Sequence, residues 1–294
     1  MRMLTALIGA CLAHGAAFAA CPPDGVSRAQ LMQLRAAKWE VSDSAQRQHL
    51  ARGLLACLVD PDPAMRDEIA FESLQAWMRA QKLDAATMQA IRTALLARLK
   101  ARDPDGFAQP FAALVLAEVA RADRVKPYLT DAERSGLVQA GTAYLSGVRD
   151  YRGYDEKEGW RHGVAHGADL MLQLSVHPAL VKKDHQAMLG AVAAQLAAAG
   201  AQAHFFHYGE GERLMAPVFY LARRGELDGA EWEAWFAALA PAPVQRPLSQ
   251  AALAYRHNLK AFLTPLYVSL SETKDGAQRA RVLPYVTKAL SRLD

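Results

Sequence analysis

The residues best suited to chemistry gather in the stretch GWRHGVAHGADLM, from Gly159 to Met171. Two histidines, His162 and His166, stand four residues apart, and Asp169 follows three residues later. On a helix spanning residues 159–174, with 100° between successive residues, these three side chains lie within about 60° of one another. The apolar residues fall on the opposite side, namely Val164, Ala168, Met171, Leu172 and Trp160. The spacing therefore predicts a helix whose polar face is directed away from its own packing face.

Three interpretations of this polar face stay open. Two histidines at i and i+4 can both reach one divalent metal ion, with Asp169 as third ligand or as the group that orients an imidazole. The metal site would then consist of His162, His166 and Asp169, although the glutamate of the zinc-protease motif HExxH is missing. The alternatives are a binding or catalytic site without a metal, and an ordinary solvated face.

Two glycines, Gly163 and Gly167, interrupt the same predicted helix. Each costs a helix interior about 1 kcal/mol relative to alanine. A glycine lets a ligand or a second helix approach the backbone closely, and either explanation fits these positions.

The preceding segment DYRGYDEKEGW places Tyr151, Arg152, Tyr154 and Asp155 next to a helix N-terminus, whose unpaired N–H groups favour anions. These side chains suit a carboxylate, a phosphate or a sugar. The alternative is an aromatic-rich turn packed on the surface.

A second polar stretch, HFFHYGEGERL, runs from His204 to Leu214. Polar loops between glycines on a helical scaffold commonly carry function. The candidate residues are His204, His207, Tyr208, Glu210 and Arg213. Glu212 is explained equally well by its favourable position in the first turn of a helix. The sequence does not decide whether this loop meets His162 and His166.

Together the two stretches resemble a family of bacterial helical proteins catalogued only as a domain of unknown function. The first family motif is matched by Gly159, Trp160, His162, Ala165, His166, Ala168 and Asp169. The second is matched best by Gly209, Glu210, Arg213 and Leu214, which favours Glu210 over Glu212 as the family position. The resemblance implies an all-helical fold and one site built from both stretches. It implies no activity.

Helical apolar spacing covers nearly the whole chain after Val26, and no segment is convincingly a strand. The spacing predicts about twelve helices, over residues 27–39, 44–59, 64–81, 84–101, 107–122, 131–148, 159–174, 185–199, 213–224, 230–239, 249–270 and 279–293. Residues 240–247, rich in proline, are expected to form a loop rather than a domain linker.

Two similar turns, which start at Asp60 and Asp103, lie 43 residues apart and each precede an alanine-rich helix. A period of about 40–47 residues with two helices per unit is typical of HEAT repeats. Arg66, Ala70 and Leu74 also fit the HEAT pattern. We therefore predict an all-α, HEAT-like superhelix, with an α/α toroid as the alternative.

The first 19 residues have the features of an export signal. Arg2 supplies a positive charge, residues 4–12 are apolar, and Ala17 and Ala19 suit cleavage before Ala20. We expect residues 20–294 to form one domain without a transmembrane segment, in the periplasm or secreted.

Two cysteines remain after such a cleavage, Cys21 and Cys57. An even pair in an exported protein predicts a disulfide. The alternatives are one buried and one free thiol, or a lipoprotein acylated on Cys21. Phe18 argues against the lipoprotein, since a small aliphatic residue is expected at that position.

The net charge of +4 is spread along the chain, with acidic residues between the basic ones. A nucleic-acid-binding protein should show a basic stripe, which this sequence lacks. Three functions remain: a periplasmic module that binds a small molecule or protein, a metal-dependent hydrolase, and a sugar-acting toroid that uses Asp155 and Glu210. The sequence does not decide whether the protein is an enzyme.

Overall fold

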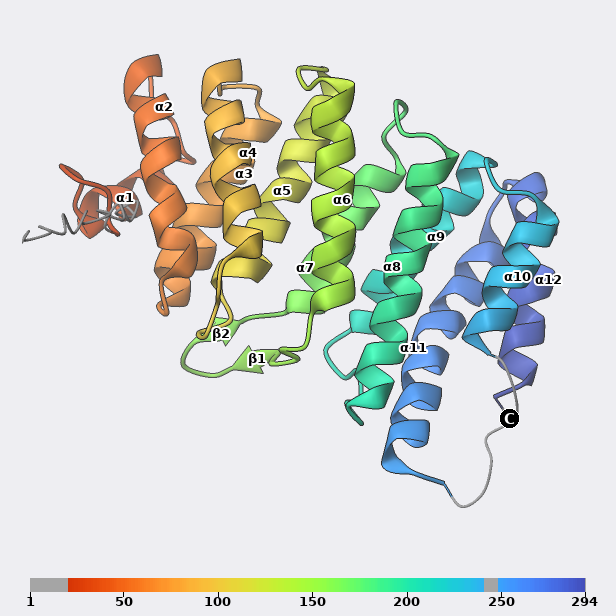
Figure 1. The fold of residues 1–294 in the computed structure, drawn as a ribbon. Coiled ribbons are helices and arrows are strands. Elements are labelled where there is room, and N and C mark those ends of the chain that lie inside the picture. The colour runs from red at the N-terminus through yellow and green to blue at the C-terminus, as the bar shows by residue number, and fades with distance from the viewer. Residues whose placement is uncertain (1–20, 241–247, 294) are drawn as a thin grey trace, which may run out of the picture.

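The computed structural model describes residues 21–240 and 248–293 (Figure 1). The expected signal segment and nearly all of the 240–247 loop lie outside these residues. Each predicted helical segment corresponds to one α-helix of the described chain, and the segments 44–59 and 64–81 each contain a second, non-α helix as well. The helices are α1 (Arg28–Ala36), α2 (Ser44–Gly53), α3 (Glu72–Arg79), α4 (Ala85–Lys100), α5 (Ala108–Val125), α6 (Asp131–Gly147), α7 (Gly163–Ser175), α8 (Lys182–Ala201), α9 (Glu210–Arg224), α10 (Gly229–Leu239), α11 (Gln250–Glu272) and α12 (Gly276–Ser291).

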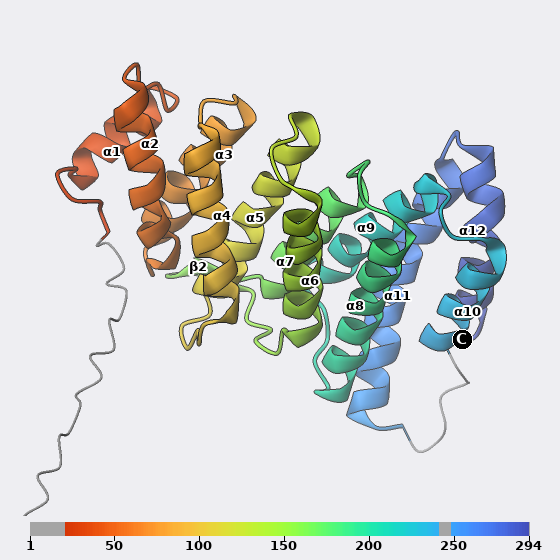
Figure 2. The same cartoon turned by 45° about the horizontal axis from the view of Figure 1, so that its top comes forward.

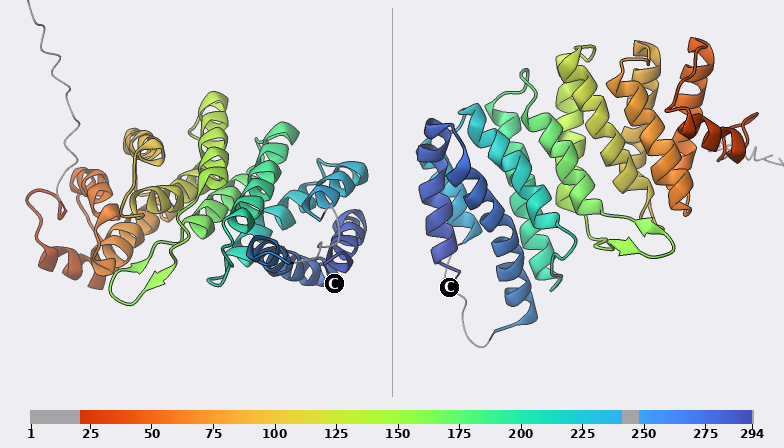
Figure 3. Two further views of the ribbon diagram at one scale, coloured as in Figure 1. Left: turned by 60° about the horizontal axis from the view of Figure 1, so that its bottom comes forward. Right: turned by 180° about the vertical axis from the view of Figure 1, so that it is seen from behind.

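The helices stack side by side in two layers, as Figures 1 and 2 show. In one layer α5 packs against α7 and α7 against α9, while α4, α6 and α8 follow one another in the second layer. Helix α11 contacts both α8 and α9, and α12 packs on α10 and α11. The first and last helices lie at opposite ends of the row, so the fold is an open α/α repeat rather than the alternative toroid (Figure 3).

Local sequence explains most helix starts. Ser27, Thr130 and Asp228 each accept a hydrogen bond from the backbone of the third helical residue, whose Gln or Glu side chain bonds back. These capping boxes satisfy N–H groups that a helix start leaves unpaired. The apolar stripes then face inward and form one continuous core that runs from Leu31 to Leu293.

The repeat is irregular between α2 and α3. Residues Leu54–Val59 form a 3₁₀ helix and Ala64–Phe71 form a π-helix, with the first Asp-Pro turn between them. Arg66 in the π-helix is fully buried. The second Asp-Pro turn is regular, because the Asp103 carboxylate accepts hydrogen bonds from the N–H groups of Gly106 and Gln109 at the start of α5.

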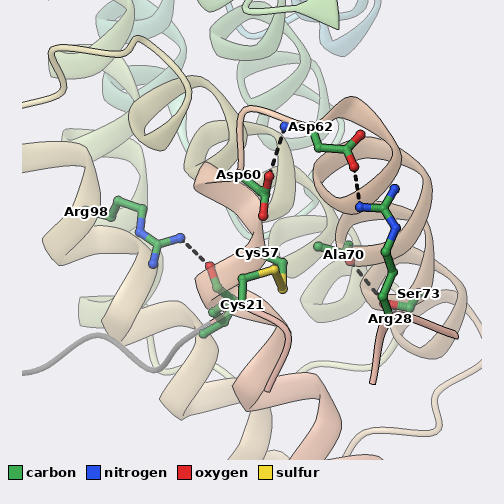
Figure 4. The surroundings of a disulfide bond; sticks show 9 residues. Cys21, Arg28, Cys57, Asp60, Asp62, Ala70, Ser73 and Arg98 are labelled. Atoms are coloured by element: carbon green, nitrogen blue, oxygen red, sulfur yellow. Dashed lines mark hydrogen bonds and ion pairs between the residues drawn. A yellow bond between two sulfur atoms is a disulfide. The ribbon is translucent and has the colours of Figure 1, made fainter. Parts of the chain in front are cut away.

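The predicted cysteine pairing is present, with Cys21 bonded to Cys57 and their Cα atoms 5.0 Å apart (Figure 4). Cys57 is buried within the 3₁₀ helix, and Arg98 donates a hydrogen bond to the nearby Leu55 carbonyl. The bond ties residue 21 to the first repeat. A sulfur in a disulfide cannot also carry a lipid, which disfavours the lipoprotein alternative. Of the helices described, none has the length and apolar character needed to cross a membrane.

One prediction of local structure is wrong. Residues 159–162 are not the first turn of a helix, since Gly159–Trp160 is a short strand, β2, paired antiparallel with β1 (Tyr154–Asp155). Helix α7 begins only at Gly163. The backbone turns the chain at Gly159 and at His162, whose φ angles of 72° and 56° are incompatible with a right-handed helix.

Candidate functional site

The segment between α6 and α7, residues 148–162, contains the β1–β2 hairpin and is called the hairpin loop. The N-terminal repeats hold it in place. Arg66 Nη2 donates a hydrogen bond of 2.7 Å to the carbonyl of Glu158, 92 residues away, and Arg161 Nε donates one of 2.8 Å to the carbonyl of Asp105. The ring of Phe107 lies between the two guanidinium groups, at 4.1 and 4.2 Å from its centroid. Cation–π contacts of this kind stabilise both arginines where they are removed from solvent.

The segment between α8 and α9, residues 202–209, is called the histidine loop, and it meets the hairpin loop directly. His162 Nε2 lies 2.9 Å from the carbonyl oxygen of Tyr208. A carbonyl only accepts hydrogen bonds, so Nε2 carries the proton and Nδ1 of the neutral ring is an acceptor. This contact joins the two stretches that sequence alone could not connect.

The fit between the two loops depends on a glycine. Gly153 lies against the ring of Tyr208, and a methyl group in its place would overlap that ring. The phenol ring therefore occupies the space that a side chain at position 153 would need.

Aromatic and imidazole rings form a continuous band along this junction. The Trp160 ring stacks on His162 at 4.6 Å, contacts Tyr154 at 5.1 Å and meets Tyr208 edge-to-face at 5.6 Å. The band continues on the histidine loop through His207 and His204, and ends where His204 stacks on Tyr151 at 4.4 Å. Tyr154 and Trp160 remain 50% and 38% exposed.

An open pocket of about 490 Å³ lies between the loops. Seven of the binding candidates from the sequence line it: Tyr151, Arg152, Tyr154, Asp155, His204, His207 and Tyr208. Gly153 and Arg161 complete the lining. Trp160 and His162 lie beside the pocket, in contact with its tyrosines. A volume in the range of roughly 300–1,000 Å³ is typical of small-molecule sites.

The remaining candidates form a second group on α7 and α9. Asp169 Oδ1 accepts a hydrogen bond of 2.6 Å from Arg213 Nη1. His166 packs its ring against Phe111 and lies 3.7 Å from Asp169 Oδ2. Both ring nitrogens of His166 are buried and have no hydrogen-bond partner among the described residues. The polar face is therefore largely covered by α5 and α9, rather than exposed as the wheel suggested.

Sequence reasoning missed the role of Arg66 in anchoring the hairpin and missed its neighbour Asp67. Asp67 faces the same cluster from the π-helix, where burial raises the pKa of its carboxyl despite the charges of Arg66 and His166. The HEAT-like pattern drew attention to Arg66, but only as a repeat position. A π-helix, which often marks functional sites, is not visible in the apolar spacing.

Burial controls the protonation of the two site histidines. It lowers the pKa of His162, helped by the neighbouring His166, although the Tyr208 carbonyl opposes the shift. Burial also lowers the pKa of His204, against the charge of Glu210. Both imidazoles are therefore neutral at pH 7, each with one donor and one acceptor nitrogen. Burial would raise the pKa of Asp169, yet His166 and Arg213 hold it below its usual range.

The two glutamates of the second stretch, Glu210 and Glu212, differ in burial, as the family pattern suggested. Glu210 is 3% exposed and its Oε2 accepts a hydrogen bond from the Tyr208 backbone N–H, so it fixes the shape of the histidine loop. Glu212 is exposed on the first turn of α9.

The two glycines of α7 serve helix packing. A methyl group on Gly167 would lie 3.1–3.2 Å from Leu145 and Tyr144 of α6, and one on Gly163 would lie 3.3 Å from the Tyr144 hydroxyl. Of the two explanations for these glycines, the close approach of a second helix is the one present in the structure.

Metal binding gains no geometric support. Within the described parts of the chain, no group of three or more His, Cys, Asp or Glu side chains is arranged to hold a metal ion. The metal site of His162, His166 and Asp169 stays a prediction from the sequence.

Comparison with known proteins gives one match. A family described as "Protein of unknown function (DUF2785)" matches residues 95–268, a range that contains the hairpin loop, the histidine loop and helices α5 to α9. No curated protein and no solved structure matches the chain significantly.

Proposed function

The chain belongs to the protein family of unknown function DUF2785, and we propose that it acts as an exported binding module for a small molecule. The site is the pocket between the hairpin loop and the histidine loop, with Trp160 and His162 at its border.

The observation that carries this proposal is the junction itself. Residues 46 positions apart are joined by the hydrogen bond from His162 to the Tyr208 carbonyl, and candidates from both loops line one pocket. Polar side chains that serve only as a solvated surface would have no reason to converge in this way.

The rigidity of the site supports a binding role. Arg66 and Arg161 hold the hairpin loop, while Glu210 holds the histidine loop. His162 is kept in a left-handed conformation, with φ of 56°, which is unfavourable for a residue with a side chain. Such backbone strain tends to occur at functional sites, where the surrounding structure maintains it. A site fixed before binding loses less entropy when a ligand enters.

The export part of the proposal rests on the signal-like first 19 residues and on the Cys21–Cys57 bond. Disulfides persist mainly in oxidising compartments, which include the periplasm and the cell exterior. No observation in the structure specifically favours the metal-dependent hydrolase, so it is not proposed.

A ligand screen with matched variants tests the proposal. Mature protein would be titrated with a small-molecule library by NMR, and hits would be quantified by calorimetry. Tyr208→Ala opens the junction, and Tyr267→Ala removes an exposed tyrosine of α11, 39% exposed, far from either loop in sequence. We expect a ligand that binds wild type and Tyr267→Ala alike and binds Tyr208→Ala at least tenfold more weakly. The proposal would be contradicted by a screen that finds no ligand, or by ligands whose affinity does not change in Tyr208→Ala.

A further inference from the structure

We propose that the ligand of this pocket is a neutral saccharide, bound with a sugar ring against Tyr154 and Trp160. This inference rests on the proposed function, since it names the ligand class of the same site. Three properties of the pocket support it: paired charges, exposed aromatic faces and neutral hydrogen-bonding groups.

The charged groups of the pocket already have ion-pair or hydrogen-bond partners within the protein. Arg152 forms an ion pair with Asp150, and Arg161 forms one with Glu158 at 2.7 Å. Asp155 Oδ1 accepts hydrogen bonds from the backbone N–H groups of Lys157 and Glu158. A phosphate or carboxylate ligand would have to compete with these partners for each guanidinium. A neutral ligand leaves all of them in place.

Two aromatic side chains, by contrast, remain partly exposed. Tyr154 and Trp160 occupy paired positions on β1 and β2 and are the two most exposed aromatic side chains of the hairpin loop. The face of an aromatic ring is electron-rich, and the C–H groups on one side of a pyranose ring carry partial positive charge. Because the two ring planes are inclined at 57°, a sugar ring can stack on one of them while its edge lies against the other.

The polar groups around the rings suit hydroxyls. His162 offers an acceptor at Nδ1, since Nε2 donates to Tyr208, and the phenol groups of Tyr154 and Tyr208 both donate and accept. Sugar hydroxyls also do both, so neutral imidazoles and phenols satisfy them without burying a charge. The lowered pKa of His162 keeps its acceptor nitrogen free at pH 7.

The ring geometry disfavours a quaternary ammonium ligand. An aromatic cage for such a cation needs ring faces that converge on an empty space. Here the Trp160 and Tyr208 planes meet at 89° in direct contact, and one face of Trp160 is covered by His162. Trp160 and Tyr208 therefore do not present two converging ring faces to a cation.

Calorimetry and saturation-transfer NMR on the mature protein would test the inference with named probes. The saccharides are cellobiose, maltotriose and N,N′-diacetylchitobiose; AMP represents an anionic stacking ligand, and choline represents a cation. We expect at least one saccharide to bind, with saturation transferred to its ring C–H protons. Trp160→Ala and Tyr154→Ala should each weaken that binding at least tenfold, while Tyr267→Ala should leave it unchanged. Circular dichroism of each variant checks folding.

The outcomes separate the two proposals. Binding of AMP or choline but of no saccharide, with loss in Trp160→Ala, overturns the saccharide inference and leaves the pocket as a binding site. Saccharide binding that survives both aromatic substitutions also overturns it. If neither these probes nor the screened library binds, both proposals fail. If Trp160→Ala does not fold, Tyr154→Ala alone decides, because its side chain is half-exposed and, among the residues that the structure describes, its ring contacts only that of Trp160.

Discussion

Two clusters in this protein use the same residue types, and their difference shows how the cluster beside the candidate pocket departs from a purely structural one. The closed triad consists of Asp123, Arg134 and His177, between α5, α6 and the end of α7. The open cluster consists of His162, His166, Asp169 and Arg213. Both combine aspartate, arginine and histidine, yet only one leaves hydrogen-bonding capacity unused.

In the closed triad, both oxygens of the Asp123 carboxylate accept hydrogen bonds. Asp123 is 1% exposed and accepts hydrogen bonds from Arg134, from His177 Nε2 at 2.9 Å and from the backbone N–H groups of Tyr128 and Leu129. The other nitrogen of His177 accepts a bond from the backbone N–H of Ala179. A buried charge with all its partners present fixes the local structure and has no capacity left for a ligand.

The open cluster differs in three ways. Its arginine is about half-exposed, His166 has two nitrogens without partners among the described residues, and His162 adopts a left-handed conformation. The comparison teaches that residue type alone does not identify a site. A site is indicated by polar atoms without hydrogen-bond partners, by backbone strain and by exposed neighbouring side chains.

The largest expected effect is on the stability of the closed triad. Asp123→Ala leaves His177 Nε2 and two backbone N–H groups without an acceptor and leaves Arg134 only its pair with the exposed Asp131, so the free energy of unfolding should fall by about 3–5 kcal/mol. Asp169→Ala breaks an ion pair whose arginine is 53% exposed, and should cost about 1 kcal/mol or less. Urea unfolding of both variants measures the difference. Equal losses would refute the division into closed and open clusters.

A second substitution tests the junction between the loops. Gly153→Ala forces a methyl group into the Tyr208 ring, and we expect about 1–3 kcal/mol of destabilisation together with the loss of ligand binding. Gly190→Ala in α8 is the matched control, because a methyl group there meets no atom within 4 Å. Thermal unfolding and ligand titration report the two effects. Unaltered ligand binding by Gly153→Ala would argue against a site between the loops.

The pH dependence of stability follows from the buried histidines. Burial lowers the pKa of His162, His185 and His204 below 6.5 in the folded protein. As pH falls through 6.5, the unfolded chain takes up protons that the folded chain does not, so stability decreases. We expect the Tm to be constant above about pH 7 and to fall by a few degrees toward pH 5. His185→Gln should reduce this slope, and a Tm that rises on acidification would contradict the assignment.

The smallest expected stability change is at His162. Glycine adopts the left-handed conformation of residue 162 without steric strain, and this gain offsets the lost hydrogen bond to the Tyr208 carbonyl. His162→Gly should therefore alter the free energy of unfolding by less than about 1 kcal/mol. Ligand binding should nevertheless weaken. His177→Gly has no strain to relieve and should destabilise the protein more. A large stability loss in His162→Gly would mean that His162 is structural, like His177.

The amino-acid sequence determined the helices because their signals are local. Apolar spacing and side chains such as Ser27 and Thr130 fix each helix within a few residues, and the two Asp-Pro turns indicated the repeat. These signals predicted the all-α repeat, and the motifs of the two polar stretches predicted the membership in a family of unknown function. The two polar stretches were visible for the same reason, since composition alone marks them.

The tertiary structure decided what those stretches form. Arg66 donates a hydrogen bond to the Glu158 carbonyl across 92 residues, and residues 159–162, which helical spacing placed in a helix, belong to the hairpin loop. The ring of His166 packs on Phe111, and Asp169 accepts a hydrogen bond from Arg213. The face expected to bind a metal is therefore largely occupied by contacts within the protein. The contact between His162 and Tyr208 joins loops whose separation in the sequence carries no signal of contact. These outcomes depend on long-range packing and hydrogen bonds, which periodicity and composition do not encode.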